Sequence, residues 1–357
     1  RERGRGPGSH HRAGCDGVQP RGQGGDARAA TTWATALAAM GVPTDTITVR
    51  TLPGRGGTRI AALAARLDAV APRAVVGAGT AAALAALAAR ELTTRPPAVV
   101  ASEHASLVAR RRSRVPAVRI GALQARRRYR SADVVIASSH ALAAEINAGC
   151  GVPASRSLIV PPPVADVVST EGVRAARVIG TARGLTVVVA GDLSAANDPL
   201  RVVAAAGELD RRGIAVELVV RPGGALSETV RRAAVSHGLA MRADDGAWGP
   251  SAVVVLGATS AGFGAELVRA AARGVPAVAV STALGVADAI VPGVTGELAV
   301  AGDAVALADA IIAASRLEVA GVDDWLARFA PASSARLLLR AVDLAVAHAD
   351  AGRAVPA

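Results

Sequence analysis

The sequence contains no lysine, so all 40 of its basic residues are arginines, and its formal net charge is +11. Aromatic residues make up only 2% of the chain, so its hydrophobic cores must be filled by small aliphatic side chains. An arginine-only, alanine-rich composition is typical of a GC-rich genome. With few aromatic side chains to stack on bases, the positive charge alone does not indicate a nucleic-acid-binding protein.

Cysteine is nearly absent as well, and Cys15 and Cys150 stand in no metal-binding or redox spacing. The 6 histidines show no ligand spacing either, so we expect no metal site. Arg90 and Glu91 interrupt the longest apolar run, which excludes a membrane span by the usual length criterion. No secretory signal pattern is present, and we therefore expect a cytoplasmic protein.

The arginines concentrate in one window, Arg110–Arg130, that contains no acidic residue. One interpretation is a solvated helix face. The other is a surface that contacts anionic lipid or an anionic acceptor, which would place the protein peripherally at the inner membrane face. Nucleic acid is a third and weaker alternative. The nine arginines of the window are Arg110, Arg111, Arg112, Arg114, Arg119, Arg126, Arg127, Arg128 and Arg130.

Buried strands alternate with helices along most of the chain, which predicts two doubly wound α/β domains facing each other across a cleft. A length of 357 residues suits two domains of ordinary size. The expected strands are 46–49, 74–77, 98–101, 133–139, 186–190, 216–220 and 252–256, and the expected helices are 24–40, 58–70, 80–90, 141–147, 199–212, 227–237 and 322–349.

The first 23 residues are Gly, Arg, His and Pro without an apolar period, and we assign them no structure. The chain does not begin with Met. We therefore expect residues 1–23 to be disordered or non-native, the authentic start having been truncated or replaced. Mass spectrometry of the native protein would test this hypothesis, which an intact N-terminus would contradict.

The segment Ser260–Val280 predicts a complete loop–helix–strand unit after the buried strand Ala252–Leu256. Phe263, flanked by glycines, opens the helix, Gly274 ends it as a left-handed cap, and Pro276 precedes the next strand. A loop of small residues that leads into a helix N-terminus directs free N–H groups and the positive end of the helix dipole at one point. This is the geometry of an anion site, and a turn buried away from any ligand would contradict it.

This segment and its continuation Gly285–Leu298 resemble the C-terminal half of retaining GT-B glycosyltransferases. The family-4-like group is the most similar, with its run E-G-F-G-x-x-x-x-E-A-x-A-x-G-x-P-V-V followed by G-G-x-x-E-x-V-x-x-G-x-T-G. Gly24–Arg28 also matches the family's G-G-x-x-R turn, and Asp133–Ser139 matches A-D-x-V-I-x-x-S. The resemblance implies transfer of a sugar from a nucleotide diphosphate sugar to an acceptor hydroxyl with retention. It also implies a GT-B fold.

The sequence departs from the family where the donor is bound. Asp192 and Asn197 replace the Arg and Lys that clamp the donor diphosphate, and Ala261 and Arg269 replace the two glutamates. Two lost charged hydrogen bonds weaken donor binding by about 10²–10⁴-fold. Arginine cannot accept the ribose hydrogen bonds of the second glutamate, a role that Glu266, one helical turn earlier, could take only in a shifted loop. A GT-B protein without catalysis, serving as a binding or partner subunit, is therefore the main alternative to an enzyme.

The resemblance implies four segments: residues 1–23, an acceptor-side domain 24–165, a donor-side domain 166–320, and a C-terminal helix 321–357 that crosses back to the first domain. The nucleotide sugar is the expected partner and co-substrate. No further cofactor is expected, and the acceptor, with a lipid-linked molecule as one option, stays open. The implied site residues are Glu103 and His104 as catalytic residues, Ser260, Gly262, Phe263, Gly264, Glu266, Arg269 and Asp288 at the donor phosphates, and Gly24 and Gly25 in the acceptor-side loop.

One further motif favours a different enzyme class. Gly77-Ala78-Gly79-Thr80-Ala81-Ala82 follows a predicted strand, opens a predicted helix and matches G-x-G-x-x-A, with Glu103 after the next strand. In isolation this is a dinucleotide-binding pattern, which predicts a nicotinamide-dependent enzyme. The pattern lies in the middle of the first domain rather than in its first strand–helix turn, which argues against that reading.

Overall fold

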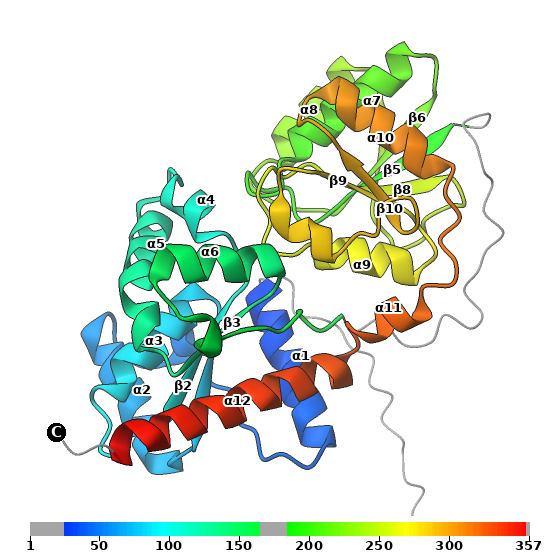
Figure 1. Cartoon of the computed structure of the whole chain (residues 1–357). Helices are drawn as coiled ribbons and strands as arrows, with labels where there is room; N and C mark the ends of the chain where they lie inside the picture. The colour runs from blue at the N-terminus through cyan, green and yellow to red at the C-terminus, as the bar shows by residue number, and fades with distance from the viewer. Residues whose placement is uncertain (1–24, 165–183, 355–357) are drawn as a thin grey trace, which may run out of the picture.

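The computed structural model describes residues 25–164 and 184–354, and these residues form two α/β domains, each built on one parallel sheet (Figure 1). We call residues 160–184, which join the two sheets, the linker. Its residues 165–183, with the predicted boundary at 165–166, lie outside the described residues, as does the segment 1–23. The helix α11 lies between the two domains, and α12 runs along the first one (Figure 1).

The first domain has a four-stranded sheet in the order β1-β2-β3-β4. Its strands are β1 (Ala74–Ala78), β2 (Ala98–Glu103), β3 (Val134–Ala137) and β4 (Ser157–Ile159). Its helices are α1 (Gly25–Ala39), α2 (Gly57–Val70), α3 (Thr80–Arg90), α4 (Leu107–Arg111), α5 (Pro116–Arg128) and α6 (His140–Cys150), with 3₁₀ helices at Val49–Thr51, Tyr129–Ser131 and Ala154–Arg156.

The second domain has a six-stranded sheet in the order β10-β9-β8-β5-β6-β7. Its strands are β5 (Leu185–Val189), β6 (Val216–Val220), β7 (Ala240–Ala243), β8 (Ala252–Leu256), β9 (Ala277–Val280) and β10 (Gly296–Ala299). The helices that follow β5 are α7 (Pro199–Arg211), α8 (Ser227–Ser236), α9 (Ala265–Ala272), α10 (Ala304–Ser315), α11 (Asp323–Ala327) and α12 (Pro331–Ala354), with the 3₁₀ helix η4 at Leu284–Asp288.

Every strand pair of both sheets is parallel, so the predicted doubly wound α/β fold is confirmed. The central strands are continuous Ala and Val runs because helices cover both faces of the sheet. In β8 all five residues are buried, as are all six residues of β2. The cores are consequently made of small aliphatic side chains, as the composition predicts.

The prediction of a strand at 46–49 is wrong. Residues 46–48 are irregular and lead into the 3₁₀ helix Val49–Thr51, and β1 pairs only with β2 among the described strands. Ile47, Val49 and Leu52 instead pack against the buried face of α2, formed by Leu63, Ala64 and Leu67. The alternating apolar side chains are thus covered by helix α2. Because no neighbouring strand pairs with this segment, it forms no β-sheet hydrogen bonds.

The C-terminal helical prediction holds with one break, because Pro331 begins a new helix and divides the segment into α11 and α12. The first turn of α12 packs against α1 of the first domain. There the Trp33 indole N–H donates to the Ser334 hydroxyl (2.7 Å), which in turn donates to the Pro161 carbonyl (2.5 Å). Trp33 and Ser334 are both fully enclosed, so this contact fastens α12, α1 and the start of the linker in one place.

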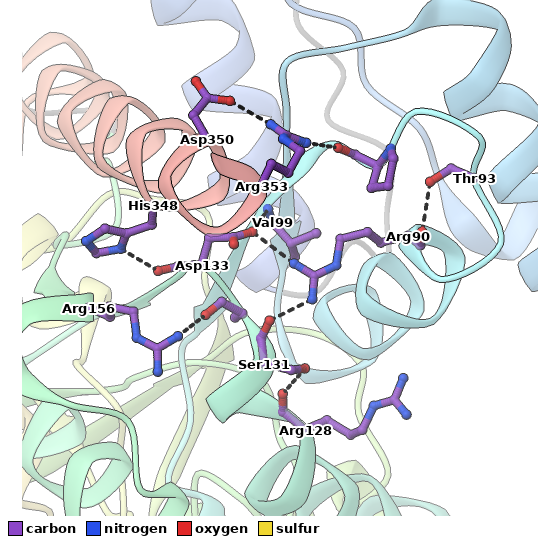
Figure 2. Close-up of polar contacts among 12 residues, drawn as sticks. Arg90, Thr93, Val99, Arg128, Ser131, Asp133, Arg156, His348, Asp350 and Arg353 are labelled. Carbon is purple, nitrogen blue, oxygen red and sulfur yellow. Dashed lines mark hydrogen bonds and ion pairs between the residues drawn. The ribbon is translucent and has the colours of Figure 1, made fainter. Parts of the chain in front are cut away.

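Figure 2 shows how the far end of α12 is fastened. The Asp133 carboxylate, at the beginning of β3, accepts hydrogen bonds from Arg90 (2.9 Å) and from the Val99 amide (2.7 Å). The Asp133 carbonyl lies 3.1 Å from a ring nitrogen of His348 on α12, and Arg353 donates to the Pro96 carbonyl (2.9 Å). These polar contacts occupy the amino-terminal edge of the sheet. Its carboxyl edge, where α/β proteins build their sites, faces the second domain.

Candidate functional site

Loops from the carboxyl edges of both sheets meet at the turn between β8 and α9. Gly262, in that turn, is buried, and a Cβ atom there would overlap the carbonyl oxygen of His104, which follows β2. The Gly262 carbonyl accepts a hydrogen bond from Ser138, which follows β3 (3.0 Å). Only glycine therefore lets the two domains approach this closely.

The Phe263 side chain is the hydrophobic anchor of the turn. It is 4% exposed, and its ring centroid lies 5.4 Å from that of Phe329, which follows α11. Phe329 stacks edge-on against Trp325 at 4.9 Å, and its carbonyl accepts from the Val164 amide at the end of the described linker (2.9 Å). Phe263 thus holds the turn in the core of the second domain, and its ring is not available to a ligand.

Fewer backbone amides of this turn are accessible to an anion than the sequence predicts. Gly262 and Phe263 are buried, whereas Gly264, Ala265 and Glu266 are only half-buried. Gly264 has a φ of +104°, which turns the chain into α9. Among the described residues, none accepts a hydrogen bond from the amides of Gly264 and Ala265, which lie at the N-terminus of α9, the positive end of its dipole. These two amides are the part of the turn that can bind an anion.

Glu103 is fully buried, and its two carboxylate oxygens are surrounded by donors. One oxygen accepts from the hydroxyls of Thr80 (2.6 Å) and Tyr129 (2.7 Å). The other accepts from the amides of His104 (3.1 Å) and Ala105 (3.3 Å) and lies 3.6 Å from Arg110. A carboxylate offers about four acceptor positions, so none is left for a substrate. This environment argues against the expected catalytic contact and favours a positioning role for Glu103.

His104 is half-buried beside the turn, and its ring lies 5.7 Å from that of Trp33. Its Nε2 is 2.8 Å from the Ser102 hydroxyl. Burial lowers the pKa of the imidazole and Arg110 lowers it too, against the opposite effects of Asp26 and Glu103. His104 is therefore neutral at pH 7 and suited to hydrogen bonding rather than to charge stabilisation.

Asp288, at the end of η4, reaches the first domain. Its carboxylate accepts from the His140 amide (2.6 Å) and lies 2.9 Å from the His140 ring nitrogen, at the N-terminus of α6. An acidic group at a helix N-terminus is favourable. The structure therefore places Asp288 in a contact between domains, next to the turn rather than at its open amides.

Glu266 and Arg269 lie on α9 and form an ion pair (2.9 Å). A second arginine, Arg221, follows β6 and reaches the same Glu266 oxygen at 3.4 Å. Burial on its own raises the pKa of the Glu266 carboxyl, but Arg269 and Arg221 outweigh it and lower the pKa. Ser260 is exposed beside the turn.

The two predicted acceptor-side glycines fall at the boundary of the described part. Gly24 lies outside the described residues, and Gly25 is the first residue of α1. A side chain at Gly25 would meet nothing within 4 Å, so packing does not account for glycine at this position.

The glycine pattern at Gly77–Gly79 has a packing explanation. A Cβ at Gly77 would overlap the backbone of Ala83, so this glycine lets α3 approach β1. A Cβ at Gly79 would overlap the Asp26 carboxylate, and the Gly79 amide already donates to the Ser102 carbonyl (2.8 Å). A negative charge therefore occupies the place of a dinucleotide pyrophosphate, which argues against the nicotinamide alternative.

In residues 25–164 and 184–354, no group of three or more His, Cys, Asp or Glu side chains could hold a metal ion. The same residues contain no helix of the length and apolarity that crossing a bilayer requires. Cys150 is a buried free thiol on α6.

Two parallel sheets whose carboxyl edges meet at a glycine-rich turn and helix N-terminus define a glycosyltransferase of the GT-B class. The model of Glycosyltransferase Family 4 matches residues 24–166, and that of Glycosyl transferases group 1 matches residues 249–323. These two matches cover more than half of the sequence, and the protein belongs to the family 4 retaining glycosyltransferases. Among curated proteins, none matches the sequence.

Solved structures share this fold at low sequence identity. HepE from Anabaena, in complex with UDP and glucose, matches with a TM-score of 0.63 and 16% identity over 90% of this chain and 96% of that one. Sucrose-phosphate synthase from Thermosynechococcus elongatus matches with a TM-score of 0.60 and 16% identity over 92% and 93%. The lipopolysaccharide outer core galactosyltransferase WaaB matches with a TM-score of 0.59 and 17% identity over 80% of each chain. The predicted GT-B fold is confirmed.

Proposed function

We propose that this family 4 glycosyltransferase holds the diphosphate of its sugar donor at the amides of Gly264 and Ala265 and transfers the sugar to an acceptor hydroxyl. The observation that carries the proposal is the half-buried first turn of α9, where both amides lack an acceptor among the described residues. Two similar structures, those of HepE and of the pneumococcal O-GlcNAc transferase GtfA, are complexes with UDP. A nucleoside diphosphate is therefore the class of leaving group that we propose.

The proposed transfer depends on stabilising the negative charge of the leaving group. When the bond between the sugar and the diphosphate breaks, negative charge grows on the leaving oxygen. Fixed N–H donors and a helix dipole that already point at this oxygen stabilise the transition state more than the ground state. The acceptor hydroxyl attacks from the side that the diphosphate leaves and gives its proton to the departing phosphate oxygen, so that the sugar keeps its configuration.

His104 is the residue that we propose to contact the transferred sugar. It follows β2, lies against Gly262, and is neutral at pH 7, so its ring can exchange hydrogen bonds with sugar hydroxyls. Glu103 and Tyr129 lie behind it and fix the loop. In this proposal Glu103 positions His104 and does not itself contact the substrate.

We expect His104→Ala to lower the rate of donor hydrolysis or transfer by about 10–100-fold, the loss of one or two hydrogen bonds in the transition state. The affinity for the free nucleoside diphosphate should stay unchanged, because the sugar and not the diphosphate is contacted. The measurement combines release of nucleoside diphosphate from a panel of nucleotide sugars with calorimetry. His237→Ala, on the exposed end of α8, is the control variant. Affinity no better than millimolar for every nucleotide sugar would contradict the enzyme and favour a partner subunit.

We further propose that the segment from α4 to α5 contacts an anionic membrane from its cytoplasmic side. The segment exposes five large apolar side chains, which is unusual for a protein that meets only water: Val108 (45%), Val115 (55%), Val118 (38%), Ile120 (52%) and Leu123 (41%). Six arginines of the same segment have no ion-pair partner among the described residues. They are Arg111, Arg112, Arg114, Arg119, Arg126 and Arg127. Apolar side chains beside unpaired cations are typical of a surface that lies on anionic lipid.

Flotation with vesicles tests this surface. We expect the protein to float with vesicles of anionic phosphatidylglycerol but not with phosphatidylcholine vesicles, and less at high salt. Ile120→Gln with Leu123→Gln should reduce the bound fraction by about tenfold, since each buried apolar side chain contributes roughly 1 kcal/mol or more. The matched control is Val235→Gln with Val300→Gln, which removes two apolar side chains from the second domain that are even more exposed (67% and 86%). Equal losses in both double variants would contradict a membrane surface at α5.

A further inference from the structure

Arg221 occupies an unusual place in the second sheet. It follows the buried end of β6 directly and extends toward Glu266 on α9, which follows β8. In the sheet, β5 lies between β6 and β8. The Arg221 side chain therefore passes over the carboxyl end of β5 to reach its partner.

The loop that follows β5 is the one from which the family pattern supplies its two diphosphate-binding cations. Here that loop carries Asp192 and Asn197 at those positions, and the two side chains are occupied with each other. The Asp192 carboxylate accepts from the Asn197 amide and from the Ser194 hydroxyl (2.8 Å). The β5 loop thus offers no cation of its own, and the cation that lies over its end is Arg221.

Arg221 is also free to bind more than its present partner. Its side chain is 39% exposed, and its contact with the described residues is a single long one, 3.4 Å from one Glu266 oxygen. A guanidinium carries five N–H donors in a planar fork that matches phosphate oxygens. Glu266, which also pairs with Arg269 at 2.9 Å, lies in the first turn of α9, next to the amides of Gly264 and Ala265.

We propose that Arg221 binds the donor diphosphate in place of the two cations missing from the β5 loop, with Glu266 and Arg269 holding it over the end of β5. This inference rests on the proposed function, because it assigns the cation of the same diphosphate site. Glu266, Arg269 and Arg221 carry a formal charge of +1 together, and Arg28 on α1 adds to the positive potential at Glu266. In this proposal the cation that binds the diphosphate comes from the loop after β6 and not from the loop after β5.

Calorimetry with UDP, GDP, ADP and inorganic pyrophosphate tests the inference. We expect Arg221→Gln to weaken the best-bound nucleoside diphosphate about 10–100-fold, the loss of one charge-assisted pair, and to weaken pyrophosphate similarly. Arg221→Lys should recover part of the loss, because it keeps the charge but not the fork. Arg232→Gln, an exposed arginine on α8 (69% exposed), is the matched control and should bind like the wild type. Circular dichroism checks that each variant is folded.

A second substitution distinguishes a direct role of Arg221 in binding from a structural role. If Arg221 supplies the missing cation, then Asp192→Arg in the Arg221→Gln background restores the affinity at least tenfold, because it returns a cation to the β5 loop. Wild-type binding that survives Arg221→Gln, or a double variant that recovers nothing, overturns the inference and leaves the proposed function standing. A wild-type protein that binds no nucleoside diphosphate overturns both.

Discussion

Gly262→Ala is expected to reduce sugar transfer at least about 100-fold while the protein stays folded, since a misplacement of roughly 1 Å in a catalytic site has that effect. The added methyl group would overlap the His104 carbonyl oxygen. That oxygen belongs to backbone after β2, so it cannot turn aside as a flexible side chain could. The two domains must separate instead, which moves His104 and the hydrogen bond of Ser138 away from the turn. Donor turnover and small-angle X-ray scattering measure the two parts of this result.

The control for this variant is Gly249→Ala, in the loop before β8. A methyl group there meets nothing within 4 Å, and the two substitutions change helix and strand propensities little because both glycines lie in loops. Gly249→Ala should match the wild type in turnover and in radius of gyration. Full activity of Gly262→Ala would mean that the domains do not meet at this turn when the enzyme works.

Glu103→Ala is expected to lower the free energy of unfolding by about 3–5 kcal/mol, the usual cost of removing one partner from a buried charged network. The change leaves the hydroxyls of Thr80 and Tyr129 and the guanidinium of Arg110 without their shared acceptor. A cavity adds to the loss. Chemical denaturation followed by circular dichroism measures the difference.

The matched control is Glu91→Ala, which removes a surface ion pair with Arg128 (2.6 Å) in the same domain. Glu91 is 58% exposed, and exposed pairs contribute about 0–1 kcal/mol. A Glu103→Ala protein as stable as the Glu91→Ala protein, yet inactive, would return Glu103 to the catalytic role suggested by its sequence position.

The fold could be predicted from the sequence because the local signals agree with each other. Fully apolar strands such as Ala252–Leu256 alternate with helices, and glycine stands where positive φ is needed, as at Gly274 (φ +68°). The prediction of a strand at 46–49 was wrong because alternation of apolar and polar residues does not determine whether a strand or a helix covers the apolar side chains. There, α2 buries it in place of a neighbouring strand.

The residues of the proposed site could be anticipated from the sequence only in part. The turn at Gly262–Gly264 and the residues Glu103 and His104 could be found by their order along the chain, and the structure brings them into one place. Arg221, Ser138 and Tyr129 were missed, because their neighbours come from other strands and helices. For Arg221 a signal existed: an arginine directly after a buried strand, in a chain whose β5 loop has no cation.

The central claim is that the amides of Gly264 and Ala265 hold the diphosphate of the donor. The most direct measurement is an amide chemical-shift map of the ¹⁵N-labelled protein during titration with a nucleoside diphosphate. If they do, the largest shifts lie at Gly264 and Ala265, at the N-terminus of α9. Shifts centred instead on Gly79 and Thr80 at the start of α3, with α9 unmoved, would contradict the claim.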